Sequence, residues 1–195
     1  MYFLRICLLG CYHPIQFAET LKDKPAPHWG FYAQLLRSMI EALLLYLPAA
    51  LLRKTPPVPS YLTFIPSENY FAVLVWLTPL IFLAQWLLGA GVAHLFLRMK
   101  GIPSDIDQVL NITGMASLVV SVVLVGWDWL WFLVGGTNRY VLVFSHLLID
   151  IWWFVLLVCG LIRLLGVSWR LALIVSFLVF TVAIPLTVVI MRSPF

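Results

Sequence analysis

The chain has 195 residues, of which 63% are hydrophobic and only 10% carry a charged side chain, and its formal net charge is +4. Soluble globular domains are about 45–50% apolar and about 25% charged, so this composition excludes a soluble enzyme, a disordered tail and a nucleic-acid-binding domain. The mean hydropathy of +1.03 indicates a chain that lies mostly in lipid, and at about 20 residues per crossing its length allows five or six membrane spans.

The first 30 residues are expected to form an N-terminal interfacial segment. Ile15, Ala18 and Leu21 recur at helical spacing, and the polar residues Glu19 and Lys22 stand between them. An apolar stripe with a polar opposite face is typical of a short helix that lies in the membrane interface. A Pro-Ala-Pro sequence follows and ends this predicted helix.

Five long apolar runs make up the rest of the chain, residues 31–195. Charges or Pro and Gly bound them, and we expect membrane spans at about residues 35–52, 70–97, 109–134, 141–165 and 171–191. Each span must be a helix, because lipid offers no hydrogen bonds to an open backbone. The predicted fold class is therefore all-α, a polytopic integral membrane protein with five transmembrane helices and an N-terminal amphipathic interfacial helix.

The positive charges predict the orientation in the membrane. With five spans, the N-terminal segment shares one side with the second and fourth loops, and that side holds eight of the 12 Lys and Arg residues, which leaves four for the other side. Cytoplasmic loops carry an excess of positive residues. We therefore expect a cytoplasmic N-terminus and a C-terminus outside.

Arg37 and Glu41 are the first ionisable residues inside a predicted span. They are four residues apart, so their side chains lie on one face of a helix and can pair. One interpretation is a self-neutralised pair at the cytoplasmic start of the first span, with the Arg37 side chain reaching the interface. The other is a substrate site, since ionisable residues inside a membrane are costly.

Asp128, His146 and Asp150 lie in the outer halves of the third and fourth predicted spans. At 1.5 Å per residue their depths are about 9, 8 and 14 Å, and a short loop joins the two spans as antiparallel neighbours. We expect Asp150 to face the interior of the bundle and to pair with His146 or a hydroxyl group, because an ionised Asp in lipid costs about 3 kcal/mol. A structural hydrogen-bond cluster and a proton or ion path both fit this pattern.

The residues indicate no metal, cofactor or catalytic site. His94 lies near the inner surface and His146 near the outer one, so about 25 Å or more separates them at 1.5 Å per residue. No phosphate-binding loop, zinc-helix motif or Ser/His/Asp set is visible in the sequence. We therefore predict a protein that is not an enzyme and has no cofactor. Its expected partners are the lipid bilayer and other membrane proteins or a larger membrane complex, with no nucleic acid.

Small residues recur four positions apart in two of the spans. Gly89 pairs with Ala93 and Ser117 with Ser121, and Gly114 lies one turn before Ser117. Such pairs let helices approach closely. They fit packing within the bundle or an interface with a partner protein.

Several landmarks resemble, in order, the Yip family, the five-span Ypt/Rab-interacting membrane proteins and their prokaryotic relatives. Residues 12–17 (YHPIQF) are similar to the amphipathic start of the family, and residues 89–94 (GAGVAH) to its small-residue stretch. Residues 111–114 (NITG) resemble the opening of its third span, although Met115 stands where the family often has Tyr. The resemblance covers about residues 11–190.

The resemblance implies a five-span membrane protein of the short prokaryotic type, without the long polar N-terminal region of the eukaryotic trafficking members. The implied location is a prokaryotic inner membrane. The expected function is non-enzymatic, namely to organise or bind other membrane proteins, and an accessory subunit of a larger complex belongs to this interpretation. The alternative is a small transporter or channel component that uses Arg37 and Glu41 or Asp128 and Asp150.

Overall fold

The computed structural model describes residues 2–22, 28–192 and 194, and all regular secondary structure in these ranges is helical. Two short helices come first, α1 (Tyr2–Tyr12) and α2 (Pro14–Lys22). The first long rod joins α3 (His28–Glu41), the π-helical turn η1 (Ala42–Tyr46) and α4 (Leu47–Leu51). A 3-10 turn, η2 (Ser67–Asn69), leads into the remaining helices, which are α5 (Tyr70–Met99), α6 (Ile106–Leu133), α7 (Arg139–Leu165) and α8 (Trp169–Ile190).

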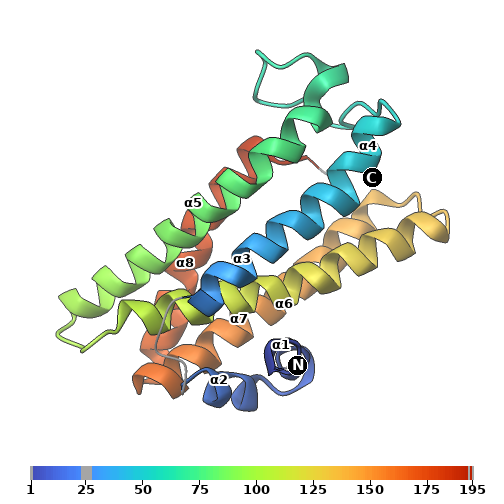
Figure 1. The fold of residues 1–195 in the computed structure, drawn as a ribbon. Helices are drawn as coiled ribbons and strands as arrows, with labels where there is room; N and C mark the ends of the chain where they lie inside the picture. The colour runs from blue at the N-terminus through green and yellow to red at the C-terminus, as the bar shows by residue number, and fades with distance from the viewer. Residues whose placement is uncertain (1, 23–27, 193, 195) are drawn as a thin grey trace.

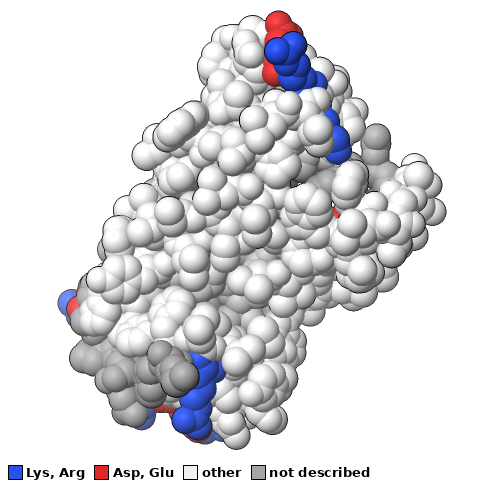
Figure 2. Space-filling view, turned by 45° about the vertical axis from the view of Figure 1, so that its right-hand side comes forward, with Lys and Arg blue, Asp and Glu red and all other residues white. Residues whose placement is uncertain are grey.

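Five helical stretches among the described residues are long and apolar enough to cross a membrane, which confirms the predicted fold class. They are His28–Leu51, Ser67–Met99, Ile106–Leu133, Tyr140–Leu165 and Trp169–Thr187. The N-terminal helices and the α5–α6 connection lie at one end of the bundle, and the C-terminus lies at the other (Figure 1). On the face shown in Figure 2, the charged side chains gather toward the two ends and leave a broad uncharged belt between them. Such a belt suits the hydrocarbon core of a bilayer.

Helix α6 is the centre of the bundle. Its most apolar window is 72% buried, whereas the corresponding windows of the other four long helices are between 17% and 39% buried. It contacts α3, α5 and α7, and also the N-terminal helices α1 and α2. Small side chains make this position possible, because Gly114, Ala116, Ser117 and Ser121 are all buried and let neighbouring helices come close.

The first span begins at His28, seven residues before the predicted start at residue 35. Helix α6 makes the early start possible, because the backbone N–H of Gly30 in the first turn of α3 donates to Asn111 Oδ1 at 2.9 Å. Such first-turn N–H groups have no partner within their own helix. As a result, Arg37 and Glu41 lie about 14 and 20 Å along the helix at 1.5 Å per residue. The prediction that they sit at the start of the span is wrong, because they lie near its middle.

The π-helical turn η1 ends two residues before Pro48. Proline has no N–H group, so Pro48 cannot donate to the carbonyl oxygen of Leu44, four residues earlier. The indole Nε1 of Trp129 on α6 donates to that oxygen instead, at 3.0 Å. The backbone N–H of Leu47 bonds to the carbonyl of Ala42, five residues back. The irregular turn is thereby supported by α6.

The other predicted span ends lie within three residues of the observed helix ends. Side-chain caps explain where three of these helices begin, because Asp105, Asn138 and Ser168 accept hydrogen bonds from backbone N–H groups in the first turns of α6, α7 and α8. Gly166 ends α7 with a left-handed φ of 65°, which glycine adopts without a steric penalty.

The N-terminal helices pack onto the bundle. Phe17, Ala18 and Leu21 of α2 are buried, and α2 contacts α7 and α6. The indole Nε1 of Trp152 on α7 donates to the carbonyl of Gly10 at 2.9 Å and so fixes the end of α1. Most of the stripe that we expected to face lipid therefore faces protein, and Ile15 alone of its three members is exposed. The interfacial position of this segment, and its separation from the rest as residues 1–30, stay predictions.

Candidate functional site: a polar cavity inside the bundle

A cavity of about 460 Å³ lies between the five long helices. Apolar and aromatic side chains form most of its wall, as is usual for ligand sites. The five ionisable residues singled out in the sequence all line it, together with two buried amides and several hydroxyl groups. Its polar residues include Arg37, Glu41, Asp128, His146, Asp150, Gln34, Gln85, Ser117 and Ser121. The structure thus brings the two predicted polar groups, one on the first span and one on the third and fourth, into one space.

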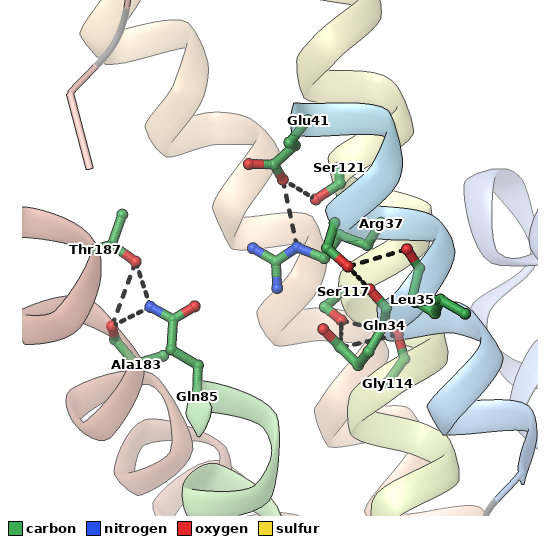
Figure 3. A network of polar contacts seen from close by, with 11 residues as sticks. Gln34, Leu35, Arg37, Glu41, Gln85, Gly114, Ser117, Ser121, Ala183 and Thr187 are labelled. Carbon is green, nitrogen blue, oxygen red and sulfur yellow. Dashed lines mark hydrogen bonds and ion pairs between the residues drawn. The ribbon is translucent and has the colours of Figure 1, made fainter. Parts of the chain in front are cut away.

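Arg37 and Glu41 form an ion pair in the middle of the first span. Arg37 Nε lies 3.4 Å from Glu41 Oε1, and the same carboxyl oxygen accepts a hydrogen bond from Ser121 Oγ at 2.7 Å. The guanidinium carbon lies 3.8 Å from the ring centroid of Phe82 on α5. In Figure 3 the guanidinium points away from α3 and α6, toward the side of the view where Gln85 and Thr187 lie. The pair is therefore held by two neighbouring helices and faces the cavity.

Gln34 lies one turn before Arg37 and is only 1% exposed. Its Nε2 donates to Ser117 Oγ and to the carbonyl of Gly114 at 3.5 Å (Figure 3). Its Oε1 atom has no hydrogen-bond partner among the described residues. A buried amide oxygen without a partner costs about 1–3 kcal/mol, so the amide of Gln34, a residue of the cavity lining, keeps one unsatisfied acceptor.

Gln85 forms the opposite wall, near the middle of α5. Its Nε2 donates to the carbonyl of Ala183 at 2.9 Å and to Thr187 Oγ1 at 2.7 Å (Figure 3). These contacts fasten α5 to α8 beside Pro185, where the α8 backbone lacks one N–H group. The cavity thus has a polar contact on both sides, one to α6 and one to α8.

His146 pairs with Asp128, not with Asp150. His146 Nε2 lies 2.7 Å from Asp128 Oδ1, and the Asp128 side chain is 6% exposed. Asp150 lies one turn further along α7, lines the same cavity, and has no hydrogen bond or ion pair among the described residues. We expected Asp150 to be the paired carboxyl; the structure gives this place to Asp128, because α6 and α7 run antiparallel and bring these two positions level.

The small residues named in the sequence contact other helices of the same bundle. A side chain at Gly114 would lie 2.6 Å from the backbone of Gly30, and one at Gly89 would lie 3.2 Å from Val179 Cγ1. Ala93 is fully buried, and the hydroxyls of Ser117 and Ser121 bond to residues of α3. All five residues therefore take part in packing within the bundle, and their role in an interface with a partner protein stays a prediction.

Three further residues matter here and carry no prediction from the sequence. Gln34 and Gln85 carry buried amides in the middle of apolar runs, which is a detectable signal because an amide in lipid needs a partner. Asn111 caps α3 from α6, and its role could not be found without knowing which helices are neighbours.

No group of three or more His, Cys, Asp and Glu residues that could hold a metal ion occurs in the part of the chain that the structure describes. His94 lies at the opposite end of the bundle from His146, where its Nδ1 is 3.0 Å from Ser104 Oγ. Polar side chains from all five long helices line the cavity.

Comparison with protein families matches the model of the Yip1 domain to residues 9–190. The chain belongs to the Yip1 domain family. Its resemblance to the Yip family, drawn above from loose motifs, is thereby confirmed. Comparison with curated proteins and comparison with solved structures gave no match.

Yip1 proteins are generally non-enzymatic membrane trafficking proteins. The matched range contains all five spans and every charged residue that lines the cavity except Arg192. The cavity therefore lies inside the Yip1 domain itself.

Proposed function

We propose that this Yip1 protein binds a small polar or amphiphilic ligand in the cavity of its bundle, as a small transporter or carrier does. One observation carries the proposal: all five intramembrane ionisable residues line a single cavity. Residues of this kind are costly in a membrane and are retained where they face a cavity or one another. The Arg37–Glu41 and Asp128–His146 contacts explain how four of these residues are tolerated in the membrane. A cluster with a purely structural role would need no cavity beside it, and the cavity therefore favours ligand binding.

Alkylation of an engineered cysteine tests whether the cavity admits polar solutes. The natural residues Cys7, Cys11 and Cys159 are replaced by Ser, and Ala183→Cys in the cavity wall is compared with Leu148→Cys, whose native side chain is 53% exposed on the outside of α7. N-ethylmaleimide reacts with the thiolate, and a thiol surrounded by lipid stays protonated. We expect Ala183→Cys to react in lipid nanodiscs and Leu148→Cys to stay unmodified. Equal protection of both positions would contradict the proposal.

A second candidate is that the protein organises or binds other membrane proteins, and membership of the Yip1 family favours it. The small residues contact other helices of the bundle, so we place the partner on the apolar outer surface instead. One example is the surface near Trp76 of α5, which is 82% exposed. Purification in mild detergent followed by identification of co-migrating proteins tests this role. A stoichiometric partner that is lost in Trp76→Ala would support it.

A further inference from the structure

The charged residues of the cavity leave one carboxyl group for a ligand. Glu41 is paired with Arg37 and Asp128 with His146. Asp150 has no such partner among the described residues, and its charged neighbours are His146, Arg37 and Glu41, which already contact one another or Asp128. Arg192 also lines the cavity, where it donates to the backbone carbonyls of Pro59 and Met191. Of the three carboxyl groups in the lining, that of Asp150 therefore remains for a positively charged group of a ligand.

Two residues of the cavity lining each carry a buried polar atom that lacks a partner. Gln34 Oε1 and Trp153 Nε1 are both buried without a hydrogen-bond partner among the described residues, and both residues line the cavity. Gln34, at 1% exposure, offers an acceptor to an N–H group. Trp153 offers a donor to an oxygen atom. A ligand that carries an ammonium group next to oxygen atoms would satisfy both.

Aromatic side chains line the same cavity. Phe82, Trp86, Trp153 and Phe180 all line the cavity, and the rings of Trp153 and Phe180 have their centroids 5.2 Å apart. Aromatic faces attract cations. Trp153 follows Asp150 by three residues on α7, so the ring and the carboxyl group lie on the same face of the helix.

The exposed part of the cavity lining, where an opening toward the bilayer would lie, is on α7 and α8. The lining residues of α3, η1, α5 and α6 are buried or half-buried, and the exposed ones are Leu147 of α7 with Ile184 and Thr187 of α8. The apolar side chains at this opening suit acyl chains. A ligand can therefore enter from within the membrane, with its polar part inside and its apolar part in lipid.

We propose that the cavity binds the ammonium head group of a membrane amphiphile, an aminophospholipid, which enters between α7 and α8. Asp150 and Gln34 receive the ammonium N–H groups, and the rings of Trp153 and Phe180 lie beside the cation. The terminal nitrogens of Arg37, whose Nε contacts Glu41, face the phosphate, and Trp153 Nε1 donates to a head-group oxygen. This inference rests on the proposed ligand-binding function and names the ligand class for the same site.

The test measures how lipids protect Ala183→Cys from N-ethylmaleimide. The protein is placed in nanodiscs of phosphatidylglycerol alone, of phosphatidylglycerol with phosphatidylethanolamine, or of phosphatidylglycerol with ethanolamine in the buffer. We expect phosphatidylethanolamine to slow alkylation by about tenfold when it is present at about ten times its dissociation constant. In Asp150→Asn the alkylation rates with and without phosphatidylethanolamine should be about equal. The protection should persist in the control Glu68→Gln, which removes an exposed carboxyl group.

The outcomes separate this inference from the proposed function. Alkylation that proceeds in every lipid without protection, or protection that survives in Asp150→Asn, overturns the inference and leaves the proposed function standing. If free ethanolamine slows alkylation and phosphatidylethanolamine does not, the ligand is not a lipid and the inference is contradicted. No alkylation in any lipid overturns the proposed function and this inference with it. If Asp150→Asn does not accumulate in the membrane, Asp150→Ser provides the same comparison.

Discussion

At the scale of single residues, the polar side chains in the membrane are held by contacts from other helices. Glu41 on α3 bonds to Ser121 on α6, and Asp128 on α6 bonds to His146 on α7. Interhelical hydrogen bonds of this kind contribute about 0.6 kcal/mol each on average. Their larger effect is positional, because they fix the direction in which each charged group faces.

The first prediction concerns the two cysteines of α1, which lies outside the spans. Burial, with a smaller contribution from nearby Cys11, raises the pKa of Cys7 to about 11, and burial also raises the pKa of the more exposed Cys11. Below its pKa a thiol gains about tenfold in thiolate for each pH unit. In a variant with Cys7 as its single cysteine, the alkylation rate should therefore still rise between pH 9 and pH 10 by about tenfold.

The matched variant retains Cys11 and lacks Cys7 and Cys159. It should react faster than the Cys7 variant at every pH below 10, because Cys11 is exposed. A rate for Cys7 that levels off near pH 9, as for a free thiol in water, would show that α1 does not pack as described.

At the scale of elements, the crossing of α3 and α6 fixes the cavity. Gly30 and Gly114 bring the two backbones into contact, and the Gln34–Ser117 and Glu41–Ser121 hydrogen bonds follow along the same pair of helices. A bulkier residue at the crossing would separate these helices and with them one wall of the cavity.

We therefore expect Gly114→Ala to destabilise the protein by about 1–3 kcal/mol, the usual cost of overpacking. The added Cβ would lie 2.6 Å from backbone atoms of Gly30, which cannot move aside as a side chain can. Gly126→Ala in the same helix is the control, because its Cβ would meet nothing within 4 Å. Thermal unfolding in detergent measures both, and equal midpoints for the two variants would refute the close crossing.

The bounds of a helix could be predicted from the sequence where residues of that helix alone set them. Hydropathy marks the last four spans, and caps such as Asp105 and Asn138 set their starts. The start of the first span was missed because its support comes from Asn111, a residue of another helix. The partner of His146 was assigned wrongly for a related reason, since spacing along α7 favours Asp150 whereas the antiparallel packing of α6 brings Asp128 closer.

At the scale of the whole molecule, the five-helix arrangement leaves the N-terminal helices and the α5–α6 connection at one end and the C-terminus at the other (Figure 1). The charge distribution in the sequence predicts that the first end is cytoplasmic. An alkaline phosphatase fused after the C-terminus should be active, and one fused at Gly101 should be inactive. Two active fusions would contradict the arrangement of spans, and the reverse pattern would contradict the orientation.

The cavity itself could not be predicted from the sequence. The ionisable residues that line it were recognisable because charges are rare in apolar spans. Their convergence depends on how the helices rotate, and this rotation is set by the small residues of α6 and by amides such as Gln85.

The central claim is that a polar cavity lies inside a bundle whose outer surface faces lipid. Spin labels at Ala183→Cys and Leu148→Cys, in the cysteine-free protein reconstituted in a bilayer, test it most directly. The account predicts that the label at residue 183 collides more with a polar nickel chelate than with oxygen, and that the label at residue 148 shows the reverse. Preferential collision with oxygen at both positions would contradict it.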